Sequence, residues 1–183
     1  MFQAFAAFLF CLLPVICLGQ VSFPQLSQPP IAFGFEDKDW GIEPTTNPKK
    51  TPHSPTPKSV PGARVIKTLE LKELLSVEKN VVVVDVLNTK KSIPGAFSME
   101  GGGDGQFYGA EKSRFAAALE KLTQGDKSRP IIFLCANSEC WLSYNAALHA
   151  LEAGYKDVIW YRGGMTDWNG ASFESKPPEL VRW

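Results

Sequence analysis

The sequence predicts an α/β domain whose mostly parallel central sheet carries helices on both faces. Two apolar runs, residues 81–86 and 131–135, are continuous rather than alternating, which is typical of strands buried on both faces of a sheet. Apolar stripes with helical spacing separate these runs along the chain. Strands separated by helices imply right-handed crossovers, and therefore parallel strands.

The expected elements follow from these signals in chain order. Thr68 can cap the first helix, and Gly154 can end the third. Residues 157–161 predict a third strand, and a short helix around Trp168 closes the domain. Three stripes predict the longer helices: Leu71, Leu74 and Leu75; Phe115, Ala118, Leu119 and Leu122; and Tyr144, Ala147, Leu148 and Leu151.

The first 19 residues have the pattern of an export signal. They carry no charged side chain, and their apolar run is short for a spanning helix, which needs about 20 residues. Small residues at Cys17 and Gly19 predict cleavage after Gly19, and hence a periplasmic or secreted protein with no stable membrane span. The alternative is an uncleaved anchor.

Residues 20–61 hold nine of the 14 prolines, which predicts an extended arm before the folded domain of residues 62–183. The apolar segments 31–35 and 40–42 can dock on that domain. We interpret residues 45–58 as plain linker.

Composition excludes several classes of function. The formal net charge is zero and no basic block stands out, so we expect neither nucleic acid nor an anionic membrane as a partner. Phosphate-binding glycine motifs are missing, and two cysteines without a matched histidine set do not form a zinc site. We therefore predict no cofactor and no metal.

Cys135 is the main candidate for catalysis. It leaves a predicted buried strand just before a helix, where loop amides and the helix N-terminus stabilise a thiolate, the nucleophilic form of cysteine. The alternative is a small apolar residue that ends a strand. The predicted substrate-binding loop comprises Ala136, Asn137, Ser138 and Glu139.

Cys140 follows closely, and signal cleavage would leave only these two cysteines. Exported chains meet an oxidising compartment, so we expect the pair to be a disulfide for part of its life. A disulfide that closes a loop of six residues stabilises the folded protein by only about 2 kcal/mol, which is little for a purely structural bond. We therefore favour a resolving thiol that attacks a persulfide or sulfenate on Cys135.

Three further residues are candidates for the site, each with a structural alternative. Asp85, also near a strand end, either orients a loop near Cys135 or caps a turn. Trp141 either walls the pocket or packs the start of a helix, which we favour. Arg162 is the nearest cation for an anionic substrate, but we favour a solvated surface arginine.

Residues 62–172 resemble a rhodanese domain. The resemblance rests on five segments in order: 82–86, 93–96, 131–135, 152–155, and 158–164 with Trp168. It implies a rhodanese-like fold in which Cys135 carries a persulfide during sulfur transfer. Residues 135–147 resemble more narrowly the exported rhodanese-like proteins named for a CXXCW motif and for association with PQQ-dependent catabolism.

The cysteine loop departs from the usual rhodanese pattern. The step from Cys135 to Ser143 is two residues longer, and Leu142 stands where an arginine is expected. Glu139 opposes both a thiolate and the binding of thiosulfate. We therefore do not expect efficient thiosulfate chemistry. Phosphatase activity is not expected either, because Trp141 occupies the position of the arginine that those relatives need.

Three functions remain open. We favour thiol-based sulfur transfer or persulfide carriage through Cys135 and Cys140, with a small sulfur compound or a thiol protein as partner. The second is a thiol–disulfide redox protein without sulfur transfer. The third is a non-catalytic module that uses Trp40 and Trp141 to hold a partner such as a quinoprotein dehydrogenase.

Overall fold

A six-stranded sheet forms the centre of the domain. The computed structural model describes residues 34–87 and 89–183, and in this part of the chain all strand pairs are parallel, with the order β1-β5-β4-β2-β3-β6. This confirms the predicted fold class. The strands are β1 Arg64–Ile66, β2 Val82–Asp85, β3 Phe97–Ser98, β4 Ile131–Leu134, β5 Val158–Tyr161 and β6 Glu179–Leu180.

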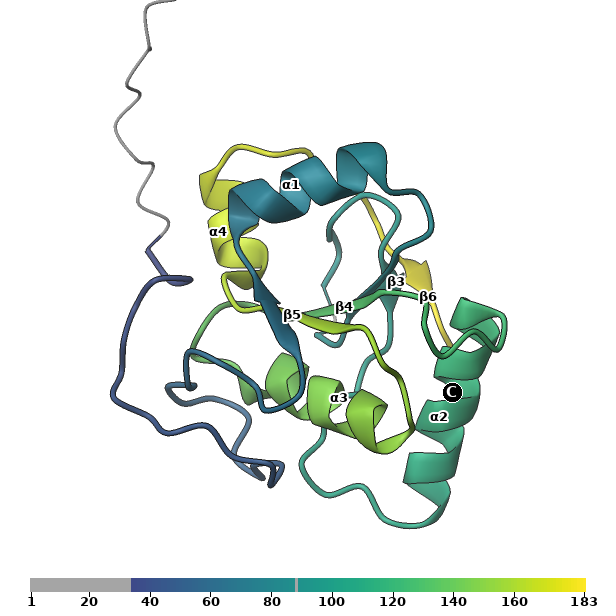
Figure 1. Cartoon of the computed structure of the whole chain (residues 1–183). Coiled ribbons are helices and arrows are strands. Elements are labelled where there is room, and N and C mark those ends of the chain that lie inside the picture. Colours follow the sequence, from purple (N-terminus) through teal and green to yellow (C-terminus); the bar gives the residue numbers. More distant parts are fainter. Residues whose placement is uncertain (1–33, 88) are drawn as a thin grey trace, which may run out of the picture. The chain divides into compact units, whose positions relative to one another are not determined.

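Helices cover both faces of this sheet. Figure 1 shows α1 and α4 on one face and α2 and α3 on the other. Their bounds are α1 Thr68–Val77, α2 Ala110–Thr123, α3 Trp141–Glu152 and α4 Gly164–Gly170. No helix in the described ranges is long and apolar enough to cross a membrane.

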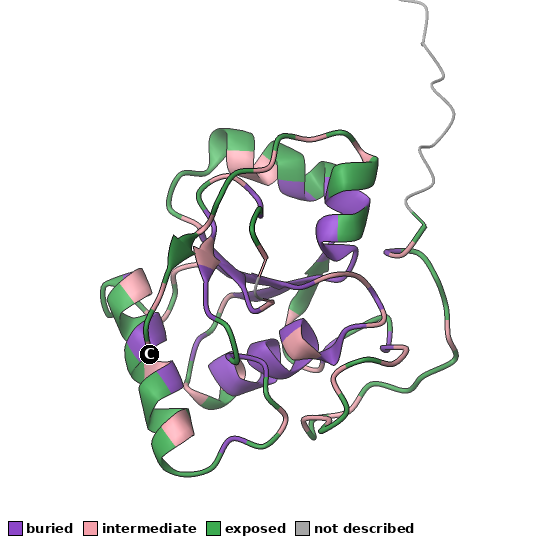
Figure 2. Cartoon of the chain, turned by 180° about the vertical axis from the view of Figure 1, so that it is seen from behind, coloured by how far each residue is buried: buried purple, intermediate pink, exposed green. Residues whose placement is uncertain are grey.

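The central strands divide the core into two layers. Within β4, Ile131 and Phe133 pack with α2 and α3, whereas Ile132 and Leu134 pack with α1 and α4. Each central strand is buried along its whole length, as Figure 2 shows. The continuous apolar runs follow from this, because a strand with helices on both faces has no solvent side.

Two local features differ from expectation. The strands β1, β3 and β6 have only two or three residues each, which is too short for a periodic signal. Thr68 does not cap α1 but is its first residue, and the cap is Lys67. The backbone N–H of Thr68 instead donates to Glu36 Oε2 at 2.7 Å.

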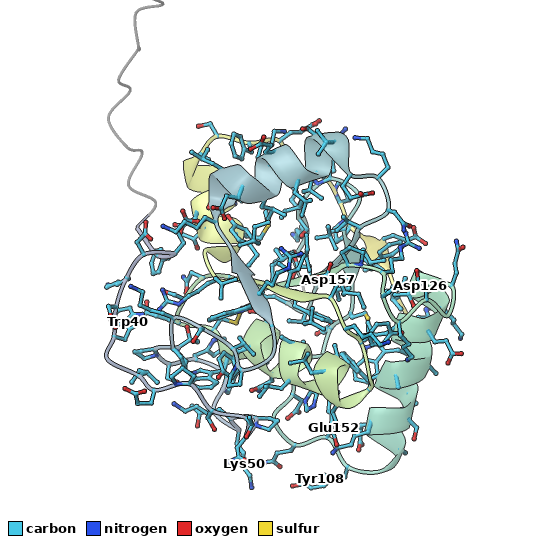
Figure 3. The ribbon with its side chains drawn as sticks, in the orientation of Figure 1. Trp40, Lys50, Tyr108, Asp126, Glu152 and Asp157 are labelled. Atoms are coloured by element: carbon cyan, nitrogen blue, oxygen red, sulfur yellow. A yellow bond between two sulfur atoms is a disulfide. The ribbon has the colours of Figure 1, made fainter. Side chains whose placement is uncertain are left out.

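The arm is docked on the domain, so our interpretation of residues 45–58 as plain linker is wrong. The Tyr144 hydroxyl accepts from Thr45 N at 2.9 Å and donates to Thr45 O at 2.8 Å. At the next residue of α3, the Asn145 side chain binds the backbone N and O of Lys49, each at 2.9 Å. Figure 3 labels Lys50 on this stretch and Trp40 before it. Side chains of α3 thus replace the ladder that prolines cannot form.

The predicted signal peptide, its cleavage after Gly19, and Cys11 and Cys17 lie outside the described residues.

Candidate functional site

The site lies at the carboxyl edge of the sheet, where sequence reasoning placed it. Asp85 ends β2 and pairs with Leu134, the last residue of β4. Cys135 follows at once, and the next five residues lead into α3. Parallel α/β sheets bind ligands at this edge.

A disulfide joins Cys135 to Cys140, with 6.5 Å between their Cα atoms. It closes a ring of six residues that ends one residue before α3. Each cysteine is only 1% exposed. The two predicted catalytic thiols are therefore in direct contact, in a covered site.

The start of α4 holds the beginning of this ring. The N–H of Met165 donates to the carbonyl of Cys135, and that of Thr166 to the carbonyl of Ala136, both at 2.9 Å. Gly164 has φ +59°, and a Cβ there would lie 2.5 Å from both carbonyl oxygens. Only glycine allows this close approach without displacing the loop.

The loop amides do not cradle the sulfur as expected. The N–H of Glu139 donates to Asn137 Oδ1 at 2.9 Å, and the N–H of Cys140 donates to Asn137 O at 3.1 Å. The N–H of Trp141 donates to Pro52 O in the arm, at 2.8 Å. With the ring closed, these amides are occupied by the loop itself and by the arm.

A hydroxyl takes their place at the sulfur. Among the described residues, the donor to Sγ of Cys135 is Ser143 Oγ, at 3.3 Å. Trp160 Nε1 donates to the same Oγ at 2.9 Å, which directs the hydroxyl proton toward the sulfur. This chain of donors would stabilise a Cys135 thiolate in the reduced protein.

Sequence reasoning did not assign Ser143 to the site. The available signal was its position in the first turn of the helix that follows the loop, because helical side chains lean toward the N-terminus.

Two of the remaining loop residues, Ser138 and Glu139, contact the arm, whereas Asn137 contacts α4. Ser138 is fully buried, and its Oγ accepts from Trp40 Nε1 at 3.4 Å. The carbonyl of Glu139 accepts from Ser54 N at 3.0 Å. The side chain of Asn137 lies 3.4 Å from Thr166 Oγ1 at the start of α4. The predicted substrate-binding role of this loop therefore requires the arm to move.

Trp141 packs at the start of α3, the role that we favoured. It is 2% exposed, and its ring centroid lies 4.6 Å from that of Tyr144. Its Nε1 donates to Pro55 O at 2.9 Å, and the Lys49 ammonium lies 4.8 Å above the ring. The indole thus joins the arm to the helix.

Asp85 organises its own loop. Its two carboxylate oxygens accept from Leu87 N at 2.9 Å and from Thr89 Oγ1 at 2.8 Å. The side chain is fully buried, and this burial raises its pKa above the ordinary value despite those donors. These contacts fit the turn-capping and loop-orienting alternatives.

Arg162 fits neither of our expectations. It is 1% exposed, so it is neither a solvated surface arginine nor a free cation for substrate. Burial lowers its pKa, but an arginine stays charged. Its guanidinium donates to four arm carbonyls: Pro57 O at 2.8 Å, Phe35 O at 3.0 Å, and Glu36 O and Thr56 O at 3.1 Å.

Asp167 completes the clamp around the arm. Its carboxylate accepts from the backbone N–H of Phe35 at 3.2 Å and of Glu36 at 2.7 Å. The pair Arg162 and Asp167 therefore binds both the carbonyl and the amide groups of the same arm segment. The function of Arg162 in this structure is to hold the arm in place.

Together, fold and site define an α/β domain with a paired-cysteine loop at the carboxyl edge of a parallel sheet. The chain belongs to the rhodanese-like domain family, whose model matches residues 67–171. No curated protein matches the chain.

Several solved structures are similar to this chain, and the first of them shows the same fold. A thiosulfate sulfurtransferase from Pseudomonas aeruginosa is 20% identical with a TM-score of 0.50, over 66% of this chain and 22% of that one. A rhodanese-like domain from Anabaena sp. is 22% identical with a TM-score of 0.48, over 61% and 77% of the two chains. A protein from Bacillus halodurans is 21% identical with a TM-score of 0.49, over 63% and 77%.

Proposed function

We propose that this protein carries sulfane sulfur as a persulfide on Cys135 and that Cys140 resolves this persulfide. The observation that supports the proposal is the Cys135–Cys140 disulfide in a loop at the carboxyl edge of a rhodanese-like sheet. Such a disulfide is the product that a resolving thiol leaves. The Ser143 hydroxyl, 3.3 Å from Sγ, supports Cys135 as the attacking thiolate.

The proposed cycle balances in three steps. Reduced Cys135 first takes a sulfur atom from the donor; a persulfide donor leaves as its thiol, and a polysulfide donor leaves shorter by one sulfur atom. The Cys140 thiolate then attacks Sγ of Cys135, forming the disulfide and releasing the outer sulfur as hydrosulfide, so that two thiols are oxidised and the sulfane sulfur is reduced. A partner dithiol finally reduces the disulfide and becomes a disulfide itself.

The charges near the loop favour a thiol-bound sulfur donor over thiosulfate. Leu142 stands where related loops would carry an arginine, and Arg162 is engaged with arm carbonyls. Glu139 adds a negative side chain to the loop. An organic polysulfide or a persulfide on a thiol protein therefore suits this site better than thiosulfate, a small dianion.

The proposed location and partner of the protein rest on its sequence. The similarity of residues 135–147 to the exported CXXCW proteins, together with the signal-like residues 1–19, supports action in the periplasm or outside the cell. It also supports a place beside PQQ-dependent catabolism, where a quinoprotein dehydrogenase is the candidate partner.

Trapping the intermediate tests the proposal. The Cys140→Ser variant, fully reduced and incubated with polysulfide, should gain one sulfur atom on the peptide that contains Cys135, as measured by mass spectrometry. The Cys135→Ser variant is the matched control and should gain none on Cys140. If reduced Cys140→Ser gains no sulfur, sulfur carriage is excluded.

A thiol–disulfide redox protein is the second candidate, because the disulfide already exists within the loop. Equilibration with glutathione buffers gives its potential. A potential below about −300 mV would mark an inert structural bond and exclude this alternative.

A further inference from the structure

A short segment of the arm lies directly on the disulfide ring. We call residues 52–56 the strap. His53 and Cys140 form an antiparallel bridge. On the same side, Ser54 N donates to Glu139 O and Thr56 N donates to Ser138 O, both at 3.0 Å. The strap thus pairs with the ring as an added strand does.

Further contacts fix both ends of the strap. Thr56 Oγ1 donates to Ser138 O at 2.7 Å. Trp141 donates from its backbone to Pro52 O at 2.8 Å and from its indole to Pro55 O at 2.9 Å. Prolines at positions 52 and 55 restrict the free chain to extended conformations, which lowers the entropy lost when the strap docks.

With the strap docked, both cysteines are covered. Both cysteines are 1% exposed, although an attacking thiol must approach a sulfur along the disulfide axis. The strap binds the carbonyls of Ser138 and Glu139, which belong to the six-residue ring. The disulfide limits the orientations of those carbonyls, so the closed ring presents a fixed edge to the strap.

We propose that the strap is a redox-gated lid, which docks on the ring when the disulfide forms and leaves it when the disulfide is reduced. The lid regulates the site assigned above, so its biological meaning rests on the proposed function. The open, reduced form accepts sulfur on Cys135. When Cys140 attacks the persulfide and hydrosulfide leaves, the Cys135–Cys140 disulfide forms again, and the strap docks on the closed ring.

A pair of matched variants tests whether the strap covers the disulfide. Thr56→Val keeps the shape of a buried side chain and removes one strap hydrogen bond, whereas Thr123→Val removes a buried hydroxyl that donates to Leu119 O at 2.9 Å within α2. Losing one bond should raise the open population, and hence the rate of reduction by dithiothreitol, about fivefold for Thr56→Val. Thr123→Val should reduce at the wild-type rate. Equal rates for the two variants would overturn the lid.

Hydrogen exchange tests the redox gate. In oxidised protein the amides of Ser54 and Thr56 should be protected, and reduction should speed their exchange on the order of tenfold, as the loop restraint is lost. Unchanged protection after reduction would contradict the gate. Neither measurement involves sulfur transfer. A missing persulfide on Cys135 would therefore refute the proposed function but not the lid, and wild-type reduction and exchange rates would refute the lid but not the proposed function.

Discussion

Arg162→Gln should destabilise the protein more than any change of a surface arginine. The guanidinium makes four hydrogen bonds of 2.8–3.1 Å to carbonyls of the arm, from a side chain that is 1% exposed. A bond from a charged donor contributes about 1.5–3 kcal/mol, but bonds from one group are not additive, and water can reach part of the freed arm. We therefore expect a loss of about 3–4 kcal/mol.

Urea unfolding of oxidised protein measures this loss as a lower midpoint. Arg64→Gln is the matched control, because Arg64 pairs with Asp157 at 2.9 Å while 60% of its side chain is exposed, and such a pair contributes less than about 1 kcal/mol. If Arg162→Gln costs no more than Arg64→Gln, the clamp contributes little and our account of the arm is wrong.

Three further changes probe the site and its surroundings. Gly164→Ala should cost about 1–3 kcal/mol in urea unfolding, because it forces a Cβ onto two carbonyls at φ +59°; wild-type stability would refute the tight contact. Ser143→Ala should slow iodoacetamide alkylation of reduced Cys135 about tenfold at neutral pH, since the thiolate loses its donor; an unchanged rate would remove the hydroxyl from the site. Burial lowers the pKa of His149 below its ordinary 6.5, so the unfolded chain binds more protons as pH falls, and wild-type stability should drop below pH 6.5 by up to about 1.4 kcal/mol per pH unit. His149→Gln should remove that part of the pH dependence. If wild type and variant lose the same stability as the pH falls, His149 is not the group responsible.

The fold was predictable because its main signals are local. The runs at residues 82–84 and 131–134 are apolar throughout, since each strand has helices on both faces. The positions of Cys135 and Cys140 followed from the same reasoning, because the end of a buried strand defines the edge where loops carry chemistry.

Docking was expected for residues 31–35 and 40–42 but not for residues 45–58, because the main chain of residues 45–58 is held by hydrogen bonds to partners about 80 to 100 residues away. Such bonds leave no periodic or apolar pattern in the sequence. Arg162 was misinterpreted for the same reason. Its acceptors are the backbone carbonyls of Phe35, Glu36, Thr56 and Pro57, and because every residue has such a carbonyl, the sequence does not mark them as partners. The loop amides of Glu139 and Trp141 were expected at the sulfur, but the loop and the arm occupy them.

The most direct test of the central claim counts hydrosulfide against disulfide in a single turnover. Reduced wild-type protein is loaded with a limiting amount of polysulfide, freed from excess donor, and followed by thiol titration and sulfide detection. Our account predicts one hydrosulfide released for each Cys135–Cys140 disulfide formed. If the disulfide forms and no hydrosulfide is released, sulfur carriage is contradicted, and the result favours a thiol–disulfide redox protein.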